Sequence, residues 1–162
     1  MIKIRKGSLK DLPEVENLWK ECIKEFQEGF IAKHPKVKAH YRMKKTASRT
    51  FRKNVESGLK SRKLALFVVE RENEMIGYGI ACMKEEIPVF KTKIGGIWDL
   101  FILKKFRNNR LKSKLKDEAF RWMKKKGIKH VSATLYSDDK SGYSLLRKWG
   151  FSDHKIEMRK EI

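Results

Sequence analysis

The chain has 162 residues, which suits one domain and argues against two separately folded ones, so we expect a single domain over residues 1–162. With 40% hydrophobic residues and only 3 prolines, the composition excludes wholesale disorder. The longest apolar run, Leu64 to Val69, is far too short for a membrane span, and the N-terminus lacks a signal-peptide pattern. Two cysteines, Cys22 and Cys82, give neither a disulfide framework nor a metal-ligand spacing, which favours a cytoplasmic protein without a metal.

Apolar periodicity predicts the elements in chain order. The first half of the chain carries a strand at 2–5, helices at about 11–28 and 39–60, and strands at 64–71 and 74–84. The second half carries a strand at 94–103, a helix at 109–126, a strand at 128–136, a helix at 139–148 and a strand at 151–158. This order, β-α-α-β-β-β-α-β-α-β, predicts a mixed α/β fold. Because a helix connects the fourth and fifth strands, we expect these two to be parallel in a mostly antiparallel sheet with helices on both faces.

The net charge of +20 comes from 40 basic and 20 acidic residues and is concentrated in two segments. Residues 33–63 hold 12 basic and 1 acidic residue, and residues 101–130 hold 12 basic and 2 acidic residues. The first segment is mostly the surface of the second predicted helix. Its basic residues include Arg42, Lys45, Arg49 and Lys53. Such concentration favours an anionic partner, which is nucleic acid, a polyphosphate cofactor, an acidic protein or a membrane surface. The alternative is a solvated face without a ligand.

The stretch from Trp98 to Leu115 is typical of a buried strand that breaks into a short loop and opens a helix. The unpaired N–H groups and the positive dipole end at such a helix N-terminus form an anion site on physical grounds alone. Lys112 and Lys116 lie four residues apart and repel each other, with no carboxylate before Asp117. A bound phosphate would relieve that repulsion, whereas a solvated face would tolerate it.

Here the sequence resembles the GNAT family of N-acetyltransferases over nearly its whole length. Besides the element order, the resemblance depends on Asp99-Leu100-Phe101-Ile102 before Phe106-Arg107 and on the closing segment Leu145 to Phe151. It implies an acyl-CoA N-acyltransferase-like fold, in which loop N–H groups bind the pyrophosphate of acetyl-CoA and the pantetheine arm lies between the splayed fourth and fifth strands. The residues that the resemblance assigns to acetyl-CoA are Phe101, Ile102, Leu103, Arg107, Asn108, Asn109, Arg110, Leu111, Lys112, Ser113 and Asp139.

The loop departs from the family's common pattern, Arg/Gln-x-x-Gly-x-Gly/Ala. When it is aligned on Arg107, both glycines are replaced, by Arg110 and Lys112. Glycine lets a phosphate approach the backbone closely, so these long side chains either crowd a phosphate or bind it with their own charges. Asn108 and Asn109 tolerate left-handed backbone and can still shape the turn.

Acetyl transfer to an amine requires a neutral nucleophile, an oxyanion donor, and often a general base and a general acid. Asp99 is the candidate base, because a carboxylate flanked by apolar neighbours can have a raised pKa. The alternative for Asp99 is an outward-facing acid paired with a lysine. The candidate oxyanion donor is the backbone N–H of Ile102 or Leu103.

The general acid is the second open question. Leu146 stands where many family members carry the tyrosine that protonates the leaving thiolate. Tyr136, at the end of the fifth predicted strand, and Tyr143, in the next helix, are candidates to replace that tyrosine. Their alternative is a packing role.

Two classes of function follow. The first is an acetyl-CoA-dependent N-acetyltransferase that acts on a primary amine held near the basic second helix. Its positive charge argues against free polyamines and favours an acidic peptide, a protein or an RNA-bound substrate. The second is a degenerate family member that binds CoA or nucleic acid through its basic surfaces without turnover. The lost glycines favour binding, the retained strand-loop-helix favours the enzyme, and a homodimer is compatible with both.

Overall fold

The structure is a computed structural model that describes residues 1–34, 38, 41–84, 93–136 and 139–158. The chain divides into two compact units, Met1–Ser132 and Ala133–Ile162. The first unit contains the whole sheet, and the second contains the last helix. In the described part of the chain, no helix is both long and apolar enough to cross a membrane. The organisation as a single domain stays a prediction.

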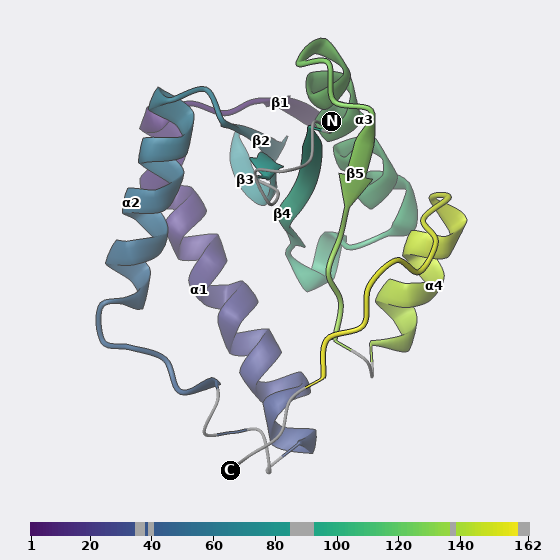
Figure 1. Ribbon diagram of the computed structural model, residues 1–162. Helices are drawn as coiled ribbons and strands as arrows, with labels where there is room; N and C mark the ends of the chain where they lie inside the picture. Colours follow the sequence, from purple (N-terminus) through teal and green to yellow (C-terminus); the bar gives the residue numbers. More distant parts are fainter. Residues whose placement is uncertain (35–37, 39–40, 85–92, 137–138, 159–162) are drawn as a thin grey trace. The chain divides into compact units, whose positions relative to one another are not determined.

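The first unit is built on a five-stranded sheet with the strand order β1-β2-β3-β4-β5 (Figure 1). The strands are β1 (Ile2–Lys6), β2 (Leu64–Arg71), β3 (Glu74–Lys84), β4 (Ile94–Ile102) and β5 (His130–Ser132). The helices are α1 (Leu12–Gly29), α2 (Ala47–Lys60) and α3 (Asn109–Lys125), and the second unit contains α4 (Lys140–Lys148). Neighbouring strands are antiparallel except β4 and β5, which are parallel. The mixed, mostly antiparallel sheet predicted from the sequence is confirmed.

Successive residues of β2 point to opposite faces of the sheet, and each face has its own layer of helices. Leu66 and Val68 lie in the core shared with α1 and α2. Phe67 and Val69 lie in the core shared with α3. Figure 1 shows α1 and α2 on one side of the sheet and α3 on the other. Because both faces are covered, β2 is apolar at every position from Leu64 to Val69 rather than alternating.

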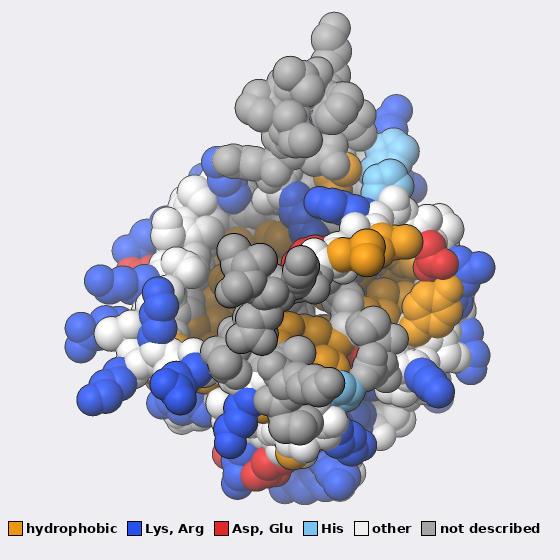
Figure 2. All heavy atoms as spheres, turned by 60° about the horizontal axis from the view of Figure 1, so that its bottom comes forward, with side chains coloured by type: hydrophobic (Ala, Val, Ile, Leu, Met, Phe, Trp, Pro, Cys, Tyr) orange, Lys and Arg blue, Asp and Glu red, His pale blue; other side chains and the backbone are white. Residues whose placement is uncertain are grey.

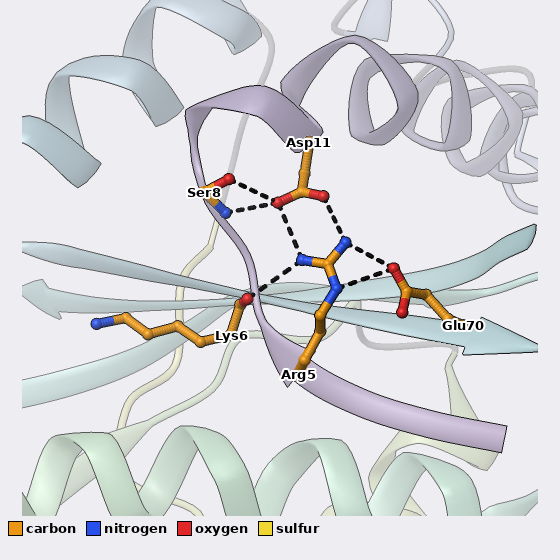
Figure 3. A network of polar contacts seen from close by, with 5 residues as sticks. All are labelled: Arg5, Lys6, Ser8, Asp11 and Glu70. Atoms are coloured by element: carbon orange, nitrogen blue, oxygen red, sulfur yellow. Dashed lines mark hydrogen bonds and ion pairs between the residues drawn. The ribbon is translucent and has the colours of Figure 1, made fainter. Parts of the chain in front are cut away.

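Arg5 on β1 joins three segments through a network of polar contacts (Figure 3). Its guanidinium donates to both carboxylate oxygens of Asp11, at 2.7 and 3.1 Å, and to Glu70 Oε1, at 2.6 and 2.9 Å. Asp11 Oδ2 also accepts hydrogen bonds from the N–H and the hydroxyl of Ser8. These contacts, the Arg5 guanidinium above all, lower the pKa of Asp11 to about 2. The network therefore fixes the entry of the chain into α1 against β1 and β2.

The predicted second helix is shorter than expected. It begins at Ala47, and the described residues just before it are not α-helical. Residues 39–40, the predicted start, lie outside the described part of the chain. A longer helix would have placed Arg42, Lys44 and Lys45 near its N-terminus, where the positive end of the helix dipole disfavours cations.

The last two predicted strands also differ from the structure. The strand expected at 128–136 is confirmed only over His130–Ser132, where it pairs with β4. The final strand expected at 151–158 is wrong, because these residues form no strand. Ile156 and Met158 supplied the apolar alternation there, yet they are 87% and 89% exposed. Without a buried face, nothing fixes the pairing of such a strand.

Candidate active site

The far end of β4 lacks a neighbour on the β5 side. β5 pairs with β4 only over Ile94–Gly96, whereas β4 continues to Ile102. Among the described residues, no strand pairs with that edge of β4 beyond this point. A register shift against β3 lies between Ile80 and Ala81 and leaves Trp98 without a partner of its own. A bulge of this kind changes the direction of the side chains beside it. The part of β4 that has no β5 partner therefore also contains the bulge that redirects the Trp98 side chain.

Asp99, the predicted base, binds a buried tyrosine of β3. Tyr78 is fully buried, and its hydroxyl donates a hydrogen bond of 2.6 Å to Asp99 Oδ2. Burial raises the pKa of Asp99, and hydrogen bonds from Tyr78 and from the Leu100 N–H offset part of that rise. Burial, followed by the charge of Asp99, raises the pKa of Tyr78 far above its ordinary value, so Tyr78 stays a neutral donor. The interpretation of Asp99 as an outward acid paired with a lysine is wrong.

Cys22 on α1 lies beside this pair. Burial above all, and then the charge of Asp99, raises the pKa of the Cys22 thiol to about 12.

A Cβ at Gly77 would lie 2.7 Å from the carbonyl oxygen of Phe101, so glycine is what lets β3 approach β4 closely there. Sequence reasoning missed the role of Tyr78. The available signal was a hydroxyl inside a run of buried residues, which must find a polar partner.

A pocket of about 330 Å³ opens beside Asp99, and we call it the aromatic pocket. Its lining residues are Trp19, Lys44, Ala47, Thr50, Phe51, Trp98 and Asp99. The Trp19 and Phe51 rings stack with their centroids 4.6 Å apart, and the Trp98 ring centroid lies 6.1 Å from that of Phe51. Aromatic faces and a carboxylate are groups that bind an alkylammonium ion. In the sequence, the helical spacing of Trp19 and Phe51 indicates core positions only.

The N-terminus of α3 is capped by Asn108, whose Oδ1 accepts a hydrogen bond of 2.8 Å from the Leu111 N–H. Asn108 has an extended backbone, with φ −147° and ψ 159°, and Asn109 does not have a positive φ either. Asn108 therefore shapes the turn as a helix cap, without the left-handed backbone that asparagine tolerates. By helix geometry, the N–H groups of Asn109 and Arg110 have no partner inside the helix. Together with the exposed side chains of Arg110 and Lys114, this end of α3 suits an anion.

Arg107, the first residue of the predicted loop motif, binds other parts of the protein. Its Nε and Nη2 donate to the carbonyl oxygen of Ile102 at 3.0 and 2.8 Å, and its Nη2 lies 2.9 Å from Glu25 Oε2. Arg107 therefore ties the end of β4 to α1. The Leu103 N–H donates to the carbonyl oxygen of Ile76 at 2.9 Å. Leu103 as oxyanion donor is therefore wrong, because its N–H is already used.

The other predicted cofactor residues of the first unit differ in exposure. The side chains of Phe101, Ile102 and Leu111 are buried in the core, so only their backbone atoms are available to a ligand. Lys112 and Ser113 are partly exposed in the first turn of α3. The part that these residues have in cofactor binding stays a prediction.

The remaining predicted site residues belong to the second unit. Asp139 caps α4, because its Oδ1 accepts a hydrogen bond of 2.8 Å from the Gly142 N–H. The Tyr143 hydroxyl donates to Asp153 Oδ2 at 3.0 Å. Tyr136 is 41% exposed. The catalytic roles of Tyr136 and Tyr143, and a cofactor contact by Asp139, stay predictions.

The sequence profile of the acetyltransferase (GNAT) family matches residues 18–151. The chain belongs to the GNAT family. The match includes Asp99, the aromatic pocket and the strand-loop-helix, and it confirms the resemblance seen in the sequence. A comparison with curated proteins found no match. Within the residues that the structure describes, no cluster of His, Cys, Asp or Glu side chains could hold a metal ion.

Solved structures of acetyltransferases share the fold of this GNAT chain. A protein from Clostridium acetobutylicum described as a predicted acetyltransferase, solved with acetyl-CoA, is 15% identical, with a TM-score of 0.77 over 99% of this chain and 96% of its own. The aminoglycoside N-acetyltransferase AAC(6')-Iy, solved with a bisubstrate analogue, is 16% identical, with a TM-score of 0.72 over 100% and 99%. A protein from Pyrococcus furiosus described as an acetyltransferase is 20% identical, with a TM-score of 0.75 over 100% of both chains. At these identities the likeness shows the acyl-CoA N-acyltransferase-like fold.

Proposed function

We propose that this GNAT protein transfers an acetyl group from acetyl-CoA to a primary amine bound in the aromatic pocket. The observation that carries the proposal is the hydrogen-bonded pair Asp99 and Tyr78. Asp99 lines the pocket and lies on β4, where that strand has lost its β5 partner. Asp99, the candidate base, therefore lies between a pocket that suits an amine and a strand edge that suits the pantetheine arm of acetyl-CoA. The acetyl-CoA in the Clostridium acetobutylicum relative supports the choice of co-substrate.

The residues of the pocket suit the deprotonation that the reaction needs. Acetyl transfer forms a bond between the amine nitrogen and the acetyl carbon, and it breaks the thioester C–S bond. The Asp99 carboxylate accepts a proton from the amine, and burial makes it a stronger base than an exposed aspartate. The charge of Lys44 beside a bound ammonium ion lowers the pKa of that ion and so favours loss of its proton to Asp99. Tyr136 and Tyr143 stay the candidates that protonate the leaving thiolate.

Tyr78 acts on the reaction through Asp99 and is a positioning residue. Its hydrogen bond to Oδ2 holds the carboxylate in one orientation. Because the pKa of Tyr78 is raised so far, the hydroxyl keeps its proton while Asp99 gains and loses one. Tyr78 therefore orients the carboxylate, and Asp99 alone transfers the proton.

The end of α3 suits the phosphates of acetyl-CoA. The first N–H groups of the helix, its dipole, and the exposed Arg110 together attract an anion. Lys112 and Ser113 lie on the same first turn. These groups replace, with side-chain charge, the close backbone approach that glycines give in other members of the family.

The direct test is Asp99→Asn in an acetylation assay with acetyl-CoA and 2-phenylethylamine, an amine that carries its own aromatic ring. We expect the rate to fall by about 100-fold or more, the usual contribution of a general base, with CoA affinity unchanged in calorimetry. The matched control is Asp117→Asn, an exposed carboxylate on α3. A wild-type rate in Asp99→Asn would remove Asp99 from the mechanism.

The second candidate function is binding of CoA or nucleic acid without turnover. The replacement of both loop glycines, by Arg110 and Lys112, favours it. It predicts CoA binding in calorimetry with no acetylation of any amine. A cytoplasmic location and a homodimer stay expectations for either function.

A further inference from the structure

Exposed basic side chains continue from the aromatic pocket along the segment that ends in α2. We call them the basic strip: Arg42, Lys44, Lys45, Arg49 and Lys53. Lys44 lines the aromatic pocket itself, so the strip begins at the site. Figure 2 shows Lys and Arg side chains gathered on the α2 side of one face of the molecule, at the left.

The chain neutralises the other cations of α2 but not those of the strip. Arg52 lies 3.6 Å from Glu16, and Lys60 lies 2.5 Å from Glu56. In the part of the chain that the structure describes, no ion pair involves a residue of the strip. Arg49 and Lys53 are one helical turn apart and therefore repel each other. A ligand that brings carboxylates to this face would relieve the repulsion.

We propose that the acceptor amine belongs to an acidic peptide segment, an inference that rests on the proposed function. The aromatic pocket binds a lysine side chain or an N-terminal amine of the peptide, and the basic strip binds carboxylates on the residues beside it. A free polyamine is a poor acceptor, because its second ammonium group would lie next to the cations of the strip. Selectivity therefore comes from the charge around the amine rather than from the amine alone.

The chemistry of the pocket favours a peptide over a nucleic acid. A nucleobase amine shares its lone pair with the ring and is uncharged, so the aromatic faces and Asp99 have no cation to recognise. An aliphatic peptide amine is a compact cation before it reacts. Single-stranded RNA binding also uses exposed rings on which successive bases stack. Here Phe51 is buried and stacked against Trp19, and Trp98 is the exposed ring of the pocket, at 44%.

The test uses short peptides that each contain one free lysine and a blocked N-terminus, with the lysine flanked by Asp, by Ser or by Arg. Acetylation is followed by mass spectrometry in wild-type protein. We expect kcat/KM to be highest for the Asp peptide, by about tenfold or more over the Arg peptide, with a gap that narrows as salt rises. Equal kcat/KM for the three peptides would overturn the inference and leave the N-acetyltransferase proposal standing.

Charge-reversed variants test the basic strip directly. In Arg49→Glu/Lys53→Glu the preference for the Asp peptide should be lost, while acetylation of 2-phenylethylamine stays near the wild-type rate. The matched control is Lys125→Glu/Lys129→Glu, which makes the same change in net charge at exposed positions at the C-terminal end of α3 and just after it. Arg49→Gln/Lys53→Gln, with circular dichroism on every variant, separates loss of binding from loss of folding. An unchanged peptide preference in both folded strip variants contradicts the proposal.

Peptide binding without acetyl-CoA decides the inference independently of turnover. Fluorescence anisotropy of labelled Asp and Arg peptides should show tighter binding of the Asp peptide to wild-type protein. If no amine is acetylated, the proposed function fails, and this measurement still reports on the strip. Equal binding of both peptides overturns the inference. So does a single-stranded RNA that displaces the Asp peptide at lower concentration, because the strip is then assigned to nucleic acid.

Discussion

The two basic segments of the chain have similar net charge but differ in where their cations form ion pairs. In residues 33–63, the basic strip has no ion pair within the described part of the chain. Among the described residues of 101–130, four cations form ion pairs, two with carboxylates elsewhere in the chain and two with carboxylates of the same segment. The pairs there are Lys105–Glu74, Arg107–Glu25, Lys116–Asp117 and Arg121–Glu118. Net charge counted along a sequence is therefore not the charge that a partner meets.

Aromatic rings add to the difference. Three lysines in or beside α3 lie over rings of the same segment, with Nζ to centroid distances of 4.8, 5.3 and 5.9 Å. Such contacts occupy a cation and bury the stem of its side chain. The described strip has no such contact, except that Lys44 borders the rings of the aromatic pocket. We therefore expect mutations in the second segment to change stability and mutations in the first to change binding.

Arg107→Ala should show the largest effect on stability. It leaves the buried carbonyl oxygen of Ile102 and the carboxylate of Glu25 without their donor. We expect the free energy of unfolding to fall by about 2 kcal/mol in urea titrations. Lys104→Ala, an exposed neighbour, should change it by less than about 0.5 kcal/mol. A stable Arg107→Ala protein with weakened CoA binding would break the comparison, because Arg107 would then serve the ligand.

The Arg5 network is the reference for a cation that is fully neutralised by the protein. The pKa of Asp11 is about 2 in the folded chain, below its ordinary value of 3.8, so the unfolded chain binds the proton more readily. The contribution of Asp11 is therefore complete above about pH 4 and is lost as pH falls toward 2. We expect about 2 kcal/mol to disappear over that window in acid unfolding. Asp11→Asn should flatten the dependence, whereas Asp117→Asn should keep it.

Tyr78→Phe tests how the hydrogen bond from Tyr78 affects Asp99 in the aromatic pocket. The Tyr78 hydrogen bond lowers the pKa of Asp99, so its loss raises that pKa. Since Asp99 works as a base in its ionised form, the acid limb of the pH profile of kcat/KM should move to higher pH. At neutral pH we expect a fall of about tenfold, because a hydrogen bond to a charged group contributes on the order of 1.5 kcal/mol. Tyr41→Phe is the control, and a purely structural role for Tyr78 predicts an unmoved pH profile.

Substitution of Arg110 should have the smallest effect, and the effect is on CoA affinity. Arg110 is the residue of the second segment that we expect to serve ligand binding rather than stability. Its side chain is exposed at the start of α3, where an anion is favoured. If Arg110 holds a phosphate, Arg110→Ala and Arg110→Gly should both weaken CoA binding in calorimetry by about three- to tenfold. Crowding of the loop predicts the opposite sign, with Arg110→Gly binding more tightly than Arg110→Ala.

The sheet could be predicted from the sequence because its buried strands are recognisable by their own apolar residues. The run Leu64 to Val69 is apolar at every position, and both of its faces are covered. The strand predicted at 151–158 failed because two apolar residues in alternation do not specify a partner. The predicted start of α2 was wrong because the spacing of apolar residues does not take account of cations, which the helix dipole disfavours at a helix N-terminus.

The candidate site was predictable only in part. Asp99 could be found because its carboxylate interrupts an apolar strand. The hydroxyl of Tyr78 in a buried run signals only that it needs a polar partner, and Trp19 and Phe51 look like ordinary core residues. Which side chains these residues meet depends on the tertiary structure. Arg107 was recognised by its place in the motif, but its bonds to Ile102 and Glu25 depend on how α1 packs on the sheet.

The complete burial of Tyr78 determines which way protons can travel. The hydroxyl has no contact with solvent and holds its proton tightly, so it cannot pass a proton from Asp99 into the interior. Cys22 beside it has a pKa of about 12 and offers no route at neutral pH either. A proton taken by Asp99 therefore does not pass inward through Tyr78 or Cys22. Asp99 also lines the aromatic pocket, so an acceptor that fills this pocket would hinder release of the proton on that side until the acceptor departs.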